Sequence, residues 1–181
     1  VAARAAAEGL EAVILCPADL EPEKLAATAV YGATIYAVDG TYDDCSRLSV
    51  ELSFELEWAF VNVGLRAYYA EGSKTLAFEI AEQLGWRAPD AVVAPIASGA
   101  LYSKVHQGFA ELRTLGLLDD AAPRLYGGQA EGCAPVAAAF AEGRAVKPLR
   151  PSTLARSLAI GNPADGDLAV ATAQASGGAV Y

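Results

Sequence analysis

The sequence predicts an α/β protein in which helices cover parallel sheets in a three-layer arrangement. Three observations support this fold class. Short apolar runs of strand length alternate with helical segments along the whole chain. These runs are uniformly apolar, which is typical of parallel strands that are covered on both faces. Hydrophobic residues make up 54% of the 181 residues and charged residues 19%, which excludes a disordered chain.

The first part of the chain begins with a helix and continues with strands and helices in turn. Residues 1–8 have a helical composition but no N-cap residue before them. Apolar runs at residues 12–16 and 34–38 predict two strands. The helix expected between them, at residues 21–31, has Pro22 near its first turn, where the missing N–H group has no cost.

Thr41 and Asp44 have the spacing of a capping box, which predicts a helix that runs towards Leu56. The next apolar run, residues 59–63, is predicted to be a third strand. Three short βα-type units thus precede the loop around residues 64–70. We expect residues 1–60 to form most of a small α/β domain and residues 61–181 to form part of a larger one.

The second part of the chain repeats the alternation. Leu76, Ile80 and Leu84 have helical spacing and predict a helix over residues 71–84. The remaining elements are expected as strands at 91–95 and 124–129, helices at 101–112, 135–142 and 165–175, and a last strand at Tyr181.

Charge and apolar run lengths restrict the classes of partner. A formal net charge of −9 argues against nucleic acid and anionic membrane surfaces, since both require a basic surface. No apolar run has the length that a membrane span needs. The three cysteines are widely spaced and form no metal-binding pair, so we predict free thiols, no metal site and a cytoplasmic protein. The chain contains no methionine and starts at Val1, so we expect it to be an internal piece.

The junction between the strand at 91–95 and the following helix is the candidate ligand site. In sheets of this kind, ligands bind at the carboxyl ends of strands. The small residues of Ile96-Ala97-Ser98-Gly99-Ala100-Leu101 allow close backbone approach, and the N–H groups of a helix start bind anions. No G-K-[ST] or G-x-G-x-x-G pattern is present. The junction predicts a phosphate site, with an ordinary tight turn as the alternative.

Several ordered segments of the sequence resemble threonine synthase, a member of the tryptophan-synthase-β-like, fold type II family of pyridoxal-phosphate enzymes. The segments cover nearly the whole chain, and the similarity lies in their order. They are RAYYAEGSKT at residues 66–75, FEIAEQL at 78–84, AVVAPIASGALYSK at 91–104, GGQAEGCAPVAAAF at 127–140 and STLARSLAIGNP at 152–163.

The resemblance implies two phosphate-binding sites. It implies that main-chain N–H groups hold the phosphate of pyridoxal phosphate at Ala97, Ser98, Gly99, Ala100 and Leu101. Ser98 and Ala100 depart from the usual glycine- and asparagine-rich form of this loop, but bonds from the backbone tolerate that change. For the phosphate of the substrate, O-phosphohomoserine, the matching cations are Arg66 and Lys74, with surface salt bridges as their alternative role.

The family reaction converts O-phosphohomoserine and water to threonine and phosphate, with the cofactor ring as an electron sink. The Schiff-base lysine of the family lies in a Ser-x-Lys-Asp-like motif, and none of the four lysines here, Lys24, Lys74, Lys104 and Lys147, stands in one. We therefore expect this lysine upstream of Val1, a further cofactor contact beyond Tyr181, no catalytic residue in this piece, and an inactive fragment of an active lyase.

Two other functions remain open. One is a serine or threonine dehydratase, or another amino-acid lyase, of the same fold. The other is an α/β binding module without chemistry. His106, the one histidine, is interpreted as a solvated or capping residue. The expected partner is a small-molecule substrate, with a homodimer as the candidate assembly.

Overall fold

The computed structural model describes residues 1–62, 67–118 and 122–181. The chain divides into two compact units, Val1–Arg66 and Ala67–Tyr181, and each is described by itself. No helix in the described ranges is both long enough and apolar enough to cross a membrane.

The first unit is a small parallel α/β unit. Its strands β1 and β2 pair in parallel, with Val13 opposite Thr34 and Pro17 opposite Val38. Its elements are α1 (Ala2–Ala7), β1 (Val13–Pro17), α2 (Pro22–Ala29), β2 (Thr34–Val38) and α3 (Tyr42–Glu55). The predicted helix and strand order is therefore confirmed as far as residue 55.

The capping box at the start of α3 is present as predicted. The Thr41 hydroxyl accepts the N–H of Asp44 at 3.3 Å, and the Asp44 carboxylate accepts the N–H of Thr41 at 2.8 Å. The N–H of Thr41 first, and then its hydroxyl, which donates to the same carboxylate oxygen at 2.9 Å, hold the pKa of Asp44 below its usual value. The reciprocal bonds satisfy two N–H groups that the helix itself leaves open.

The third strand predicted in this part, at residues 59–63, is wrong in the described portion of that range. Residues 59–62 form neither a strand nor a helix. The apolar composition favours a strand, but a strand also needs a hydrogen-bonded neighbour. Trp58 and Phe60 stack on each other instead, with ring centroids 6.3 Å apart.

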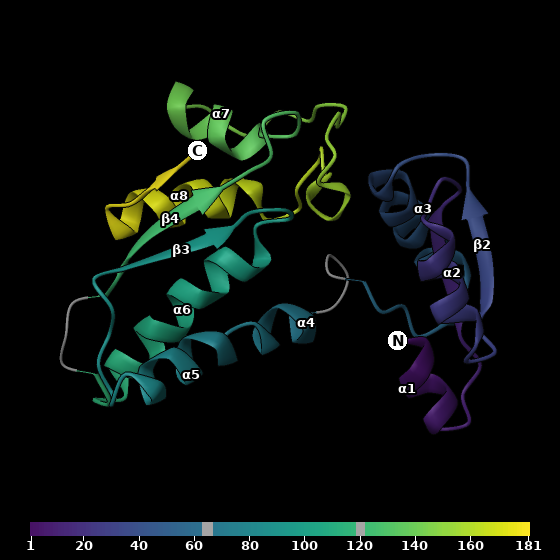
Figure 1. Cartoon of the computed structure of the whole chain (residues 1–181), viewed down its shortest axis with the longest axis horizontal. Helices are drawn as coiled ribbons and strands as arrows, with labels where there is room; N and C mark the ends of the chain where they lie inside the picture. Colours follow the sequence, from purple (N-terminus) through teal and green to yellow (C-terminus); the bar gives the residue numbers. More distant parts are fainter. Residues whose placement is uncertain (63–66, 119–121) are drawn as a thin grey trace. The chain divides into compact units, whose positions relative to one another are not determined.

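The second unit contains a parallel sheet with strand order β3-β4-β5 (Figure 1). Helices connect one strand to the next along the chain. Ala91 pairs with Arg124 and Tyr126 with Ala179. The elements are α4 (Ala67–Gly72), α5 (Thr75–Gln83), β3 (Ala91–Pro95), α6 (Ala100–Thr114), β4 (Arg124–Gly128), α7 (Pro135–Glu142), the 3₁₀ turn η1 (Arg156–Leu158), α8 (Gly166–Ser176) and β5 (Ala179–Val180).

The single helix predicted at residues 71–84 is two helices, α4 and α5, separated by Ser73 and Lys74. The N–H of Lys74 reaches back only three residues, to the carbonyl of Glu71 at 3.1 Å, and the Thr75 hydroxyl donates to the carbonyl of Gly72 at 2.8 Å. Glycine and serine have low helix propensity, which explains why the helix is interrupted at this point.

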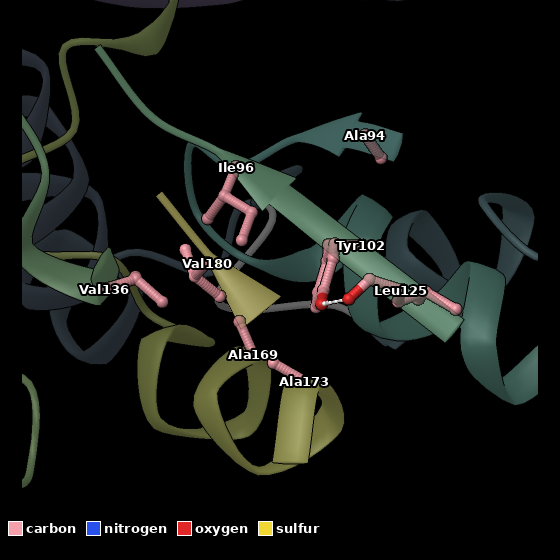
Figure 2. Close-up of a cluster of buried hydrophobic side chains, with 8 residues drawn as sticks. All are labelled: Ala94, Ile96, Tyr102, Leu125, Val136, Ala169, Ala173 and Val180. Atoms are coloured by element: carbon pink, nitrogen blue, oxygen red, sulfur yellow. Dashed lines mark hydrogen bonds between the residues drawn. The ribbon is translucent and has the colours of Figure 1, made fainter. Parts of the chain in front are cut away.

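Two buried clusters form the core of the second unit. One lies around β4 and is drawn in Figure 2, where the Tyr102 hydroxyl donates to the Leu125 carbonyl at 2.8 Å. Burial raises the pKa of Tyr102 to about 12, so the hydroxyl stays protonated. The other cluster lies between α5 and α6 and contains Ala77, Ala81, Val105, Phe109, Leu112 and Leu118.

The uniformly apolar strands predict burial on both faces, and this expectation is wrong for β3. The side chain of Ala94 is buried, but that of the adjacent Val93 is 79% exposed. Successive side chains of a strand point to opposite faces. The described residues therefore cover β3 on the Ala94 face and leave the Val93 face open.

Candidate functional site

The candidate site lies at the carboxyl edge of the second unit's sheet, where β3 leads into α6. The N–H of Ile96, directly after β3, donates to the carbonyl of Gly128 at the end of β4, at 2.8 Å. This bond continues the parallel ladder by one residue. It therefore fixes the point from which the loop Ala97–Leu101 leaves the sheet.

The second anchor of this loop is the start of α8. The N–H of Asp165 donates to the carbonyl of Ser98 at 2.9 Å. Gly99 has a φ of +96°, and a Cβ atom there would lie 2.5 Å from the main-chain oxygen of Asp165. Only glycine fits both the backbone angle and the space. The loop is thus held in one shape by β4 on one side and by α8 on the other.

This shape leaves main-chain N–H groups available at the start of α6. The first helical bond within the helix comes from the N–H of Ser103 to the carbonyl of Gly99, at 3.0 Å. The N–H of Ala100 meets the Ser98 hydroxyl only at 3.4 Å. Among the described residues, the N–H groups of Leu101 and Tyr102 have no acceptor. A phosphate would supply oxygen acceptors to such groups, so the loop fits the phosphate of the cofactor.

A pocket of about 350 Å³ opens at the same sheet edge. Among the described lining residues, Gln129 has the one strongly polar side chain, and it is engaged, because its Oε1 accepts the N–H groups of Val136 and Ala137 at 2.8 and 2.9 Å. The pocket walls are therefore apolar in character. They are formed by Val93, Ala94, Pro95, Gly128, Gln129, Ala130, Ala155 and Leu158.

Of the two cations predicted to bind the substrate phosphate, Arg66 lies outside the described residues. Lys74 is described and is 9% exposed. Its Nζ contacts Glu71 Oε2 at 2.5 Å and Glu111 Oε1 at 2.6 Å. Glu111 stands three turns into α6, about 15 Å along the helix axis from the loop Ala97–Leu101. The structure does not bring Lys74 to this loop, and its contact with a substrate phosphate stays a prediction.

Two contributors to the site were missed from the sequence. Asp165 acts through its main-chain N–H, so its side chain gives no signal. Gln129 could have been found, because it directly follows a strand whose carboxyl end is at the ligand edge. The five residues Ala97 to Leu101 do lie together at that edge, in the position expected from the sequence.

Comparison with known families gives a match over the whole chain. The sequence profile of the family described as "Pyridoxal-phosphate dependent enzyme" matches residues 1–181. Curated relatives include a threonine synthase of Methanocaldococcus jannaschii, 33% identical over 98% of this chain and 44% of that protein. The threonine synthase of Synechocystis is 36% identical over 98% of this chain and 44% of its own length. The predicted resemblance to threonine synthases is confirmed, and the chain spans less than half of these relatives.

Solved structures confirm the fold. Maize serine racemase superimposes with a TM-score of 0.77 at 22% identity, covering 99% of this chain and 51% of that protein. A fungal L-serine ammonia-lyase from Rhizomucor miehei gives a TM-score of 0.71 at 19% identity, over 99% of this chain and 54% of its own. At these identities the similarity concerns the fold alone.

Proposed function

This chain belongs to the pyridoxal-phosphate-dependent enzyme family, and we propose that it is part of a threonine synthase, which converts O-phosphohomoserine and water to threonine and phosphate. The observation that carries the proposal is that the N–H groups of Leu101 and Tyr102, at the start of α6, have no acceptor among the described residues. The close approach of Gly99 to the backbone of Asp165 fixes the loop in the shape that leaves these groups available. The identity of 33–36% to threonine synthases over nearly the whole chain supports this choice of reaction.

In the proposal, the loop Ala97–Leu101 binds the cofactor phosphate through its backbone, and Ser98 adds one hydroxyl. When bound, the cofactor supplies an electron sink for elimination and hydration. Arg66 is proposed to bind the substrate phosphate. Residues 1–60 are proposed as most of the small domain and residues 61–181 as part of the large cofactor-binding domain.

The lysine that binds the cofactor covalently is proposed to lie outside this chain. Lys24 is paired with Glu21 at 3.1 Å, and Lys74 and Lys104 are both engaged by Glu71. An ammonium group that is bound by carboxylates must leave them before its nitrogen can act as a nucleophile. These pairings support the proposal that the chain alone is inactive, because an uncharged amine is what the chemistry requires.

A cytoplasmic location is part of the same proposal. Cys16, Cys45 and Cys133 are all buried, and none of them forms a disulfide bond. Burial is the first cause that raises the pKa of the Cys45 thiol, which keeps it protonated and unreactive. Unpaired buried thiols are typical of reducing compartments.

The test is a titration with pyridoxal phosphate, in parallel with pyridoxal, which lacks the phosphate. The chain should bind pyridoxal phosphate more tightly, and Gly99→Pro should abolish that preference, because proline removes an N–H group and cannot adopt a φ of +96°. Ser98→Ala should lose one hydroxyl bond, around 0.5–1.5 kcal/mol, and so at most about tenfold in affinity. A Gly99→Pro variant that kept the wild-type preference would place the phosphate elsewhere.

The reaction itself is tested on the whole protein that contains this chain. Release of inorganic phosphate from O-phosphohomoserine, with formation of threonine, is expected. Formation of a keto acid and ammonia from serine or threonine, without use of the phosphorylated substrate, would instead identify a dehydratase.

A further inference from the structure

Five side chains form a closed ring of ion pairs and hydrogen bonds, which we call the charge ring. One belongs to α4, three to α6, and the fifth is Lys74, which directly precedes α5. Lys104 Nζ contacts Glu71 Oε1 at 2.5 Å, and Glu71 Oε2 contacts Lys74 Nζ at 2.5 Å. Lys74 Nζ then contacts Glu111 Oε1 at 2.6 Å. The amide of Gln107 closes the ring, with Nε2 donating to Glu111 Oε1 at 3.1 Å and Oε1 accepting from Lys104 at 2.8 Å.

The ring is electrically balanced, because two ammonium groups face two carboxylates. Lys74 is its most buried member, with 11% of its side chain exposed, against 44% for Glu71 and 40% for Glu111. The hydrogen bonds that Lys74 donates, to Glu111 first and then to Glu71, raise the pKa of Lys74. The ammonium charge of Lys74 is thus matched within the ring and leaves no net charge there for an anion.

The backbone places Lys74 in the ring by close contact between α5 and α6. A Cβ atom on Gly108 would lie 2.8 Å from the Cβ of Ala77 and 3.0 Å from the main-chain oxygen of Lys74. The start of α5 therefore lies directly on α6. Because the helix is interrupted at Ser73 and Lys74, the ammonium group of Lys74 lies where it contacts both Glu71 of α4 and Glu111 of α6.

The helix α4 depends on this ring more than α5 does. It has six residues, which is too short for a stable helix on its own, and none of its described side chains belongs to the buried hydrophobic core. Its Glu71 is bound on one carboxylate oxygen by Lys74 and on the other by Lys104. Both bonds join α4 to neighbours, one to the start of α5 and one to α6.

We propose that Lys74 is a positioning residue: through the charge ring it fixes α4, the helix that directly follows Arg66 in the sequence, and it does not itself contact the substrate phosphate. The inference rests on the proposed function only where it names that phosphate. It gives the Glu-Gly-Ser-Lys segment a physical role, which is to hold the helix that follows Arg66 against α6.

The first experiment measures amide hydrogen exchange of residues 67–72 by mass spectrometry in the chain itself. Lys74→Met and Glu111→Gln should each speed exchange in α4 by about tenfold, because each opens the ring. Lys74→Arg should restore slow exchange, since a guanidinium group can donate to both carboxylates. Glu79→Gln is the matched control, with the same loss of charge on an exposed position of α5, and should leave α4 unchanged. Unchanged exchange in both ring variants would overturn the inference.

The second experiment asks whether Glu111→Gln weakens or strengthens phosphate binding. A positioning role of Lys74 and a direct contact of Lys74 with the phosphate predict opposite changes. Inorganic phosphate is titrated by phosphorus NMR, with pyridoxal phosphate in excess so that the cofactor loop is filled. If Lys74 acts through α4, Glu111→Gln should weaken phosphate binding several-fold relative to Glu79→Gln. If Lys74 touched the phosphate, Glu111→Gln would release its ammonium group and strengthen binding, which would overturn the inference. A third outcome separates the two proposals. If the wild-type chain binds no phosphate but the ring variants still exchange faster in α4, the proposed phosphate site is overturned and the role of the ring in holding α4 is supported.

Discussion

The two units of this chain bury their side chains to very different degrees. In the second unit, two hydrophobic clusters fill the spaces between sheet and helices, and Phe109 is 0% exposed. In the first unit, the buried apolar residues among those described are Ala2, Cys16 and Cys45, all small. Large apolar side chains of this unit lie at the surface, and Phe54 is 83% exposed.

This difference indicates that the two units are stabilised by different forces. The second unit has a packed core, whose contribution grows with buried apolar area. The first unit has a parallel two-stranded ladder and the capping box at Thr41 and Asp44, which are local hydrogen-bond devices. Local devices contribute about 1 kcal/mol each, so the first unit should unfold at a lower denaturant concentration.

The sequence provides a reporter for each unit. Its two tryptophans are Trp58, in the first unit, and Trp86, in the second. Replacing either one with phenylalanine leaves a single fluorescent probe, so that urea unfolding of each unit is followed separately. The two probes together report which unit a substitution destabilises.

The largest expected effect is that of Phe109→Ala, which removes a fully buried ring from the cluster between α5 and α6. It should lower the free energy of unfolding of the second unit by about 3–5 kcal/mol. Phe54→Ala is the matched control in the first unit, and at an exposed position should change stability by less than about 0.5 kcal/mol. If Phe109→Ala shifted the unfolding transition of Trp58 as far as that of Trp86, the two units would unfold together. That result would contradict the idea that they are stabilised separately.

Gly99→Ala comes next, and it sharpens the comparison within the second unit. Both Gly99 and Gly116 have positive φ, but only Gly99 has a neighbour where its Cβ would lie. Gly116→Ala should therefore cost about 1 kcal/mol for the backbone conformation, and Gly99→Ala about 2–4 kcal/mol because it also pushes against Asp165. The Trp86 transition measures both. Equal losses of unfolding free energy in the two variants would mean that the backbone at Asp165 shifts to accept a Cβ atom at little cost.

Thr41→Ala addresses the first unit. It removes the hydroxyl that caps α3 and should reduce stability there by about 1 kcal/mol, seen with Trp58 and absent with Trp86. Thr41→Ser keeps the hydroxyl and serves as the control. An effect of Thr41→Ala below a few tenths of a kcal/mol would show that the first unit does not depend on its cap.

The smallest effect concerns His106, the one titratable ring of the second unit near neutral pH. Burial lowers the pKa of His106 below 6.5, and among the described residues its Nδ1 has no partner. At a pH more than about one unit above 6.5 the imidazole is neutral in both states and has no effect on stability. Below that value the unfolded chain takes up the proton first, so stability falls with pH until the folded-state pKa is reached. His106→Gln should remove this slope between pH 7 and 5.5, as seen with Trp86.

A proton NMR titration checks the same shift directly, because the chain has a single histidine. Its resonance should titrate below pH 6.5 in the folded chain. A midpoint at or above that value would show that His106 is solvated, which is one of the two roles, solvated or capping, that the sequence indicates.

The sequence predicted those parts of the fold that depend on local signals. Strands such as Thr34–Val38 and the capping box at Thr41 are local patterns, and they were found at their positions. The strand expected at residues 59–63 was wrong over the described residues 59–62, because strand formation depends on a neighbour, which a local pattern does not contain. The division between α4 and α5 depends on Ser73 and Lys74, whose partners are partly on another helix.

The candidate site was predictable to the same extent. The position of the loop Ala97–Leu101 followed from the rule that ligands meet parallel strands at their carboxyl ends. Its shape did not follow, because it depends on Asp165, which is far along the chain and acts through its backbone. Lys74 was predicted as a cation for the substrate phosphate, with a surface salt bridge as its alternative role, and the phosphate contact stays a prediction. Its carboxylate partner Glu111 belongs to α6 and was not foreseen.

The strand pairings also set an order in time during synthesis. In the first unit Val13 pairs with Thr34, so β1 finds its neighbour soon after it is made. In the second unit Tyr126 pairs with Ala179, at the far end of the chain, where Figure 1 shows β5 beside β4. At ribosomal speeds this edge of β4 stays without β5 for on the order of 3–10 s. The better packed unit is therefore the later one to close, and until then its open strand edge is exposed to wrong pairing.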